Sequence, residues 1–191
     1  MLLGASKDDR TISAERFVLL SKAGVTRGVF ALVDDQVPSL RLYDQKGTER
    51  VALQVMPDRT PTLSLCNDQR ATSLWAGVVR NDLPAFELRD REKRTRISCG
   101  VQSRGSTALN FQDSKGNLRL SMGLSNTDTA SLYYKDSNGS DLMGLFSADQ
   151  SLFFYKRDNA FHKSIQLSVE PKEAPSLLIT DKDGKQSFKA P

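Results

Sequence analysis

A pattern of apolar and polar residues recurs every 23 residues along this chain. Leu40, Leu63, Phe86 and Leu109 occupy equivalent positions, and each is followed two residues later by another apolar residue. A fixed period of this length is the signature of a tandem-repeat protein, in which each repeat is one supersecondary unit. The sequence predicts about eight units in a single domain over residues 11–191, preceded by a lead-in segment over residues 1–10.

Each unit contains two runs in which apolar and polar residues alternate, which is the pattern of a half-buried strand. A D-x-x-G turn separates them, as in Asp44 with Gly47. Aspartate accepts hydrogen bonds from nearby backbone N–H groups, and glycine adopts the left-handed conformation that closes a hairpin. Arg70 and Lys93 replace this glycine in two units. A looser loop rich in Pro, Asn and Asp is expected to lead to the next unit.

Charged residues recur at fixed places around the turn. We expect the carboxylates to cap the turns rather than to bind a metal, and the arginines beyond the turn to pair with them across the hairpin. As exposed ion pairs these contribute about 0 to 1 kcal/mol each. The carboxylates are Asp44, Asp68, Asp90, Asp113, Asp136, Asp158 and Asp181, and the arginines are Arg27, Arg50, Arg96 and Arg119.

A single sheet of such hairpins has one apolar face that must be covered. Three identical chains could each form one side of a triangular prism, one chain could coil into a parallel β-helix, or four blades could form a propeller. The tight turn favours antiparallel hairpins over a β-helix, and a period of 23 rather than 46 residues argues against a propeller. The prediction is an all-β, extended antiparallel hairpin array, β-prism or solenoid-like, with a homotrimer favoured.

The unit resembles tandem hairpin repeats of uncharacterised bacterial proteins and, more loosely, the shaft repeats of viral fibres. The resemblance is carried by the pattern L-x-L-x-D-x-x-G-x-x-R, seen as Leu40, Leu42, Asp44, Gly47 and Arg50, and covers about residues 11–188. It implies a repetitive β-structure and no particular activity.

Charge and composition narrow the classes of function. The net charge is +4, with basic and acidic residues interspersed, which argues against binding to nucleic acid. No stretch has the roughly 18 apolar residues of a membrane-spanning helix, and the N-terminal residues lack the layout of a signal peptide. No cofactor or metal is expected, and Cys66 and Cys99 are interpreted as small apolar fillers. The location stays open, with the cell surface, a particle or the periplasm favoured over the cytoplasm.

Few residues stand out as candidates for a specific site. Trp75, Tyr43 and Tyr133 are expected on the outward face, where an aromatic side chain either contacts a partner or ligand or packs on an adjacent strand. The single histidine, His162, lies in the seventh unit, Ser151–Ala174, which is displaced from the repeat register. We find no catalytic constellation and predict a non-catalytic structural or assembly protein that self-associates through its apolar face. The alternative is a monomeric binding module for a protein or carbohydrate on a β-solenoid or four-bladed propeller.

Overall fold

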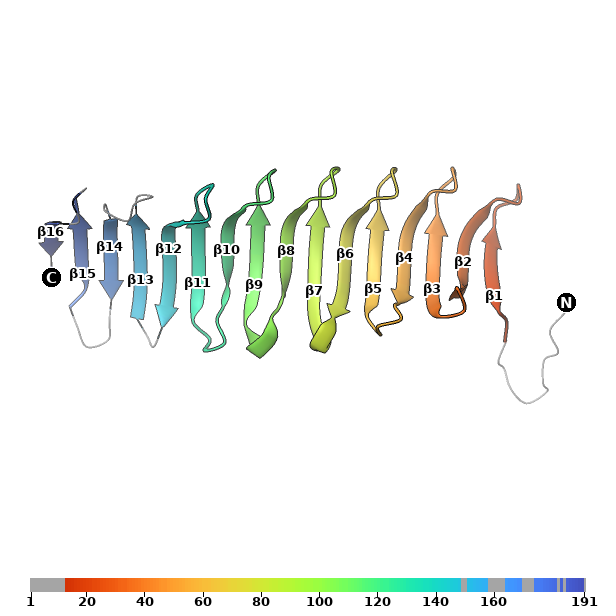
Figure 1. The fold of residues 1–191 in the computed structure, drawn as a ribbon, viewed down its shortest axis with the longest axis horizontal. Coiled ribbons are helices and arrows are strands. Elements are labelled where there is room, and N and C mark those ends of the chain that lie inside the picture. The colour runs from red at the N-terminus through yellow and green to blue at the C-terminus, as the bar shows by residue number, and fades with distance from the viewer. Residues whose placement is uncertain are drawn as a thin grey trace. The chain divides into compact units, whose positions relative to one another are not determined.

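Antiparallel strands make up most of the chain in the computed structural model, which describes residues 13–148, 151–157, 164–169, 174–181, 183 and 185–190 (Figure 1). These residues contain no α-helix, only two single-turn 3-10 segments, η1 (Arg80–Asp82) and η2 (Ser103–Gly105). The all-β prediction is confirmed. The chain divides into two compact units, Met1–Arg80 and Asn81–Pro191. The prediction of one domain stays a prediction.

The first unit is a meander in which each strand pairs with the next strand along the chain. All of these pairings are antiparallel. Its strands are β1 (Arg16–Leu20), β2 (Thr26–Val33), β3 (Val37–Tyr43), β4 (Glu49–Val55), β5 (Pro61–Cys66) and β6 (Thr72–Val79).

The second unit continues the same plan, again with antiparallel pairing between consecutive strands. Its strands are β7 (Leu83–Arg89), β8 (Thr95–Val101), β9 (Thr107–Gln112), β10 (Leu118–Leu124), β11 (Ala130–Lys135), β12 (Asp141–Ala148), β13 (Ser151–Arg157), β14 (Ser164–Val169), β15 (Ser176–Thr180) and β16 (Gln186–Ala190).

Continuous pairing separates this fold from the alternatives. Propeller blades contain four strands, so pairing would stop after every fourth strand. Here β4 pairs with β5 over five residue pairs, and β8 with β9 over another five. A parallel β-helix would stack parallel strands, whereas every described pairing is antiparallel. The hairpin array is therefore the fold, and the propeller is excluded.

The D-x-x-G hairpin turns share one hydrogen-bond pattern. At Asp44 the backbone N–H donates to the Thr48 carbonyl at 2.9 Å, and Gly47 donates back to the Asp44 carbonyl at 3.1 Å. The Asp44 carboxylate accepts from the N–H groups of Lys46 and Thr48 at 2.8 and 3.0 Å. Gly47 has φ of +75°. This side-chain cap is why aspartate begins the turn and glycine closes it.

The prediction of a looser loop between units is wrong for three connections, which lie at the strand ends opposite the D-x-x-G turns. Met56, Gln102 and Ser125 each donate to the carbonyl four residues on, the same five-residue turn as at Asp44. At Ser125 the hydroxyl takes the role of the carboxylate, accepting from the N–H groups of Thr127 and Thr129 at 3.1 and 3.2 Å. Both ends of the strands are thus closed by tight turns.

Candidate functional site

One side of the strands, named here the apolar face, carries three rows of side chains that register aligns across neighbouring strands. The central row runs through Phe17, Phe30, Leu40, Leu53, Leu63 and Ala76 in the first unit. In the second unit it runs through Phe86, Cys99, Leu109, Met122, Leu132, Leu145, Phe154, Leu167 and Leu177. Alternation and in-register pairing together produce a continuous stripe within each unit.

Side chains of the apolar face are open to solvent. Phe30 is 54% exposed, Leu53 51% and Met122 44%, and most of the large exposed hydrophobics of the described chain lie on this face. Among the described residues of its rows, Lys156 in β13 is the single charged side chain. A contiguous exposed apolar surface of this kind marks an interaction surface.

On the opposite side of the strands, named here the polar face, long side chains shield their smaller neighbours from solvent. Ser39, Ala52 and Thr62 lie on it and are 2%, 4% and 7% exposed. Ala52 is flanked across the strands by Arg41 and Ser64, and long neighbouring side chains of this kind shield small residues. The Arg41 guanidinium pairs with Glu49 at 3.3 Å. Burial in this fold is therefore on the polar side.

The three aromatic candidates lie on the polar face, as the alternation predicted. Trp75 pairs with Ser64, and its ring lies over Gly77, where an added Cβ would approach ring carbon Cζ2 to 2.6 Å. Tyr43, at the end of β3, and Tyr133, opposite Gly144, are half-buried.

The four candidate residues do not all belong to one unit. Trp75 and Tyr43 lie in the first unit and Tyr133 in the second, and His162 lies outside the described residues. A related arrangement occurs in the second unit, where the Tyr155 ring covers Gly144 and makes an edge contact with Phe146 at 6.4 Å between centroids. The predicted binding role of these residues stays a prediction.

The arginine of the repeat occupies a β-bulge. In β8 Thr95 pairs with Arg89 and Ile97 with Leu88, so Arg96 is the extra residue. The same break in register leaves out Arg27, Arg50, Ser73, Arg119, Leu142 and Ser187. A bulge redirects the side chain of its extra residue. The sequence signal, six residues after the capping residue of the turn, was present, but periodicity alone did not reveal its structural cause.

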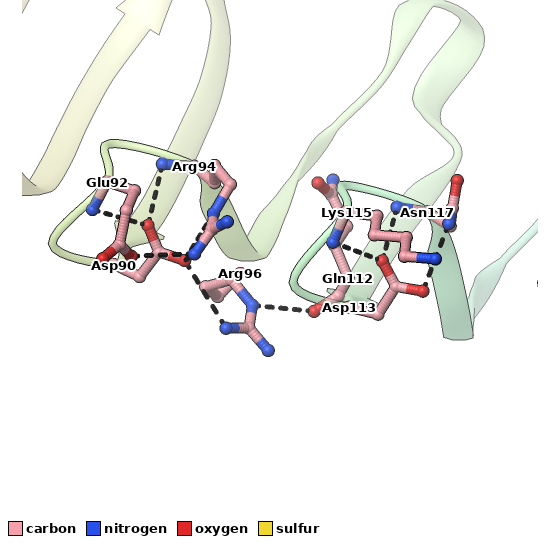
Figure 2. Close-up of polar contacts among 8 residues, drawn as sticks. All are labelled: Asp90, Glu92, Arg94, Arg96, Gln112, Asp113, Lys115 and Asn117. Atoms are coloured by element: carbon pink, nitrogen blue, oxygen red, sulfur yellow. Dashed lines mark hydrogen bonds and ion pairs between the residues drawn. The ribbon is translucent and has the colours of Figure 1, made fainter.

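Bulge arginines connect their own turn to the next hairpin. Figure 2 shows Arg96 between two turns: its Nη1 lies 3.5 Å from the Asp90 carboxylate and its Nε donates to the Gln112 carbonyl at 2.9 Å. Arg119 lies 3.5 Å from the Asp113 carboxylate, and its guanidinium carbon lies 5.9 Å from the centre of the Tyr134 ring. The ion pair expected across the hairpin is confirmed at these turns.

Asp68 is not a capping residue, which corrects the prediction. In its turn the amide oxygen of Asn67 accepts from the N–H groups of Gln69 and Ala71 at 2.9 and 3.0 Å. The Asp68 carboxylate is 92% exposed and pairs instead with Arg50, whose Nη1 also lies 3.8 Å from the Asp44 carboxylate. Asparagine was overlooked because it carries no charge, although its side-chain oxygen caps equally well. Asp158 lies outside the described residues.

Turn geometry lowers the pKa of three aspartates. At Asp44 the main cause is the backbone hydrogen bond from Thr48. At Asp90 and Asp113 partial desolvation acts to raise the pKa but is outweighed by hydrogen bonds, first the backbone bonds from Arg94 and Asn117 respectively. The pKa of Arg119 is raised, first by its hydrogen bond with Tyr134. These hydrogen bonds favour the charged form of each carboxylate.

Asp136 lacks the bulge arginine that follows Asp44, Asp90 and Asp113. Its Oδ1 accepts from the N–H groups of Asn138 and Ser140 at 2.8 and 2.9 Å, and the residue is 6% exposed. Leu142 occupies the bulge position, and the enclosed Oδ2 has no hydrogen-bond partner. A buried unsatisfied oxygen costs about 1 to 3 kcal/mol.

Asp181, which begins a calcium-like D-x-D-G stretch, is a turn cap. Its carboxylate accepts from the N–H groups of Asp183 and Lys185, both at 2.9 Å. Across the described residues no group of three or more His, Cys, Asp or Glu side chains could hold a metal ion. No helix in that part of the chain could span a membrane. Cys66 and Cys99 are free thiols, with Cys99 exposed on the central row of the apolar face.

Comparison with models of protein families finds no match, and comparison with curated proteins likewise finds none.

Proposed function

We propose that this chain is a non-catalytic structural or assembly protein, a β-repeat scaffold whose copies associate through the apolar face. The observation that carries the proposal is the exposure of that face: Phe30, Leu53 and Met122 are 44–54% exposed in rows that contain one charged residue among those described. At about 25 cal/mol per Å² of apolar surface removed from water, rows left exposed add little to the stability of an isolated chain, whereas burial between copies would add to it.

A homotrimer is the favoured assembly. A six-residue strand is about 20 Å long, so three strands closing a triangle would place its centre about 6 Å from each side. That distance matches the reach of the leucine and phenylalanine side chains in the central row. A cyclic assembly of this kind buries the apolar rows of every copy equally.

Light scattering on the purified chain tests the proposal. We expect a mass near three times the 21.2 kDa of one chain. A mass near twice that of one chain would retain self-association and reject the trimer. A stable, folded monomer at micromolar concentration would contradict the proposed function.

A second candidate function is a binding module that uses the polar face for a carbohydrate or protein. The observation in its favour is the placement of Trp75, whose ring lies over Gly77 and so presents a flat aromatic surface. Trp75 is the only tryptophan, so its fluorescence reports on this surface alone. Saturable quenching by soluble oligosaccharides would favour this function, and an unchanged spectrum across neutral and acidic glycans would reject carbohydrate binding at Trp75.

A further inference from the structure

The apolar face of the second unit is hollowed on one side. A depression of about 590 Å³ lies over β8–β12, between the central row and the row nearest the opposite edge. The depression forms because three residues of that row are small, namely Thr107, Ala130 and Ser147. The lining is almost wholly apolar.

In the strands that carry these small residues, the row nearest the D-x-x-G turns has large side chains instead. In β9 the large residue Phe111 lies four positions from Thr107, and in β11 Tyr134 lies four positions from Ala130. In β12 Met143 lies four positions from Ser147. Tyr134 is 40% exposed on this face, and the guanidinium carbon of Arg119 lies 5.9 Å from the centre of its ring. Each of these strands therefore has a large residue at one end and a small residue at the other.

We propose that the hollow receives the large side chains of a second copy of this chain, with Phe111 and Tyr134 of one copy filling the space beside Thr107 and Ala130 of the next. This inference rests on the proposed self-association and specifies its geometry. Two copies can face each other with each strand opposite the same strand of the other copy, an arrangement called here matched strand levels. The row nearest the D-x-x-G turns in one copy then packs against the row at the other strand ends of the second copy. Copies related by an axis parallel to the strands would bring the two large rows together and leave the hollow empty.

The area available suits a stable interface. Ten strands at about 4.8 Å spacing and about 20 Å length give a face of about 960 Å² on the second unit of each copy. Two such faces bury about 1,900 Å², the upper part of the range for specific interfaces. The single charge in the described rows, Lys156 in β13, lies outside the residues that line the hollow. An apolar, self-complementary surface therefore matches another copy better than a charged partner.

A cysteine pair tests the geometry directly. In the full chain with Cys66→Ser and Cys99→Ser, the variant carrying Ala130→Cys and Tyr134→Cys places two thiols on one strand about 13 Å apart, too far for a disulfide within one chain. We expect mild oxidation to convert most of this protein into covalent oligomers on a non-reducing gel. The single-cysteine variants should give none. The pair Thr107→Cys with Phe111→Cys on β9 repeats the test should replacing Tyr134 disturb β11.

The outcomes separate the inference from the proposed function. An oligomer by light scattering in which neither pair cross-links, or in which a single-cysteine variant cross-links, would overturn this geometry and leave self-association standing. A monomer that forms no cross-link would overturn both. Cross-linking of both pairs, with single-cysteine variants silent, supports matched strand levels, and the size of the closed covalent product distinguishes two copies from three.

Discussion

The two faces of the same strands differ in how far the chain's own side chains bury them. On the polar face, Ala52 is buried by its neighbours. At the turn after β7, Asp90 is capped and paired by residues of its own hairpin, one of which, Arg96, also donates to the Gln112 carbonyl. On the apolar face, Leu53, the residue directly after Ala52, is half exposed. Local contacts within the chain therefore cover the polar side, while the apolar side is left open to solvent.

The largest effect is expected from a charge on the apolar face. Leu53→Glu should shift the light-scattering mass from that of the oligomer to that of a single chain, because burying a carboxylate without a partner costs several kcal/mol. Gln54→Glu is the matched control, since it places the same charge one residue along on the polar face. Equal masses for the two variants would break the distinction between the faces.

On the polar face, overpacking should affect the stability of the chain itself. Ala52→Leu adds volume at a position that is 4% exposed, so we expect a loss of about 1 to 3 kcal/mol in the free energy of unfolding by urea titration. Ala76→Leu, at a half-buried position in the central row of the apolar face, serves as the control. A smaller loss for Ala52→Leu than for Ala76→Leu would reverse the comparison.

Leu142→Arg should restore the missing partner of Asp136. The new guanidinium at the bulge can reach the enclosed Oδ2, as Arg96 reaches Asp90, so we expect a gain of about 1 kcal/mol in urea denaturation. Ser73→Arg places arginine at the same position beside the neutral cap Asn67 and should gain less. An equal gain in both variants would show that the carboxylate is not the cause.

Glycine at the turn position with positive φ should change the free energy of unfolding somewhat less than the new arginine does. Arg70 and Lys93 have φ of +58° and +65° where other turns have glycine. Arg70→Gly should therefore stabilise by up to about 1 kcal/mol, and Gly47→Ala should destabilise by a similar amount. Thermal melting of both variants measures the pair, and a destabilised Arg70→Gly would mean that the arginine side chain outweighs its backbone strain.

Acid should weaken the turns that Asp44, Asp90 and Asp113 cap. The folded pKa values of Asp44, Asp90 and Asp113 are lowered, so their contribution is present above the unfolded pKa of about 3.9 and is lost as pH falls through the folded values. We expect the urea midpoint to fall as the pH is lowered below about 4. A variant with asparagine at all three positions keeps the cap, as Asn67 does, and its midpoint should fall less steeply.

Sequence patterns were informative where local chemistry decides structure. The turn at Asp44, the strands around it and the side of the sheet that carries Trp75 followed from alternation and turn chemistry. Patterns failed where two residue types satisfy one geometry. Asn67 caps a turn that was assigned to Asp68, and Ser125 caps a turn that was expected to be a loose loop.

By itself, the sequence determined the period, the all-β class and the apolar character of one face, because strand alternation and Asp or Gly turns depend on residues close together in the chain. Only the tertiary structure decided that the repeat arginine occupies a bulge, that the small residues Ala52 and Ser39 are the buried ones, and that the second unit is hollowed beside Ala130. These features depend on register between strands, which sets the neighbours of each side chain and is not encoded in any single run of residues.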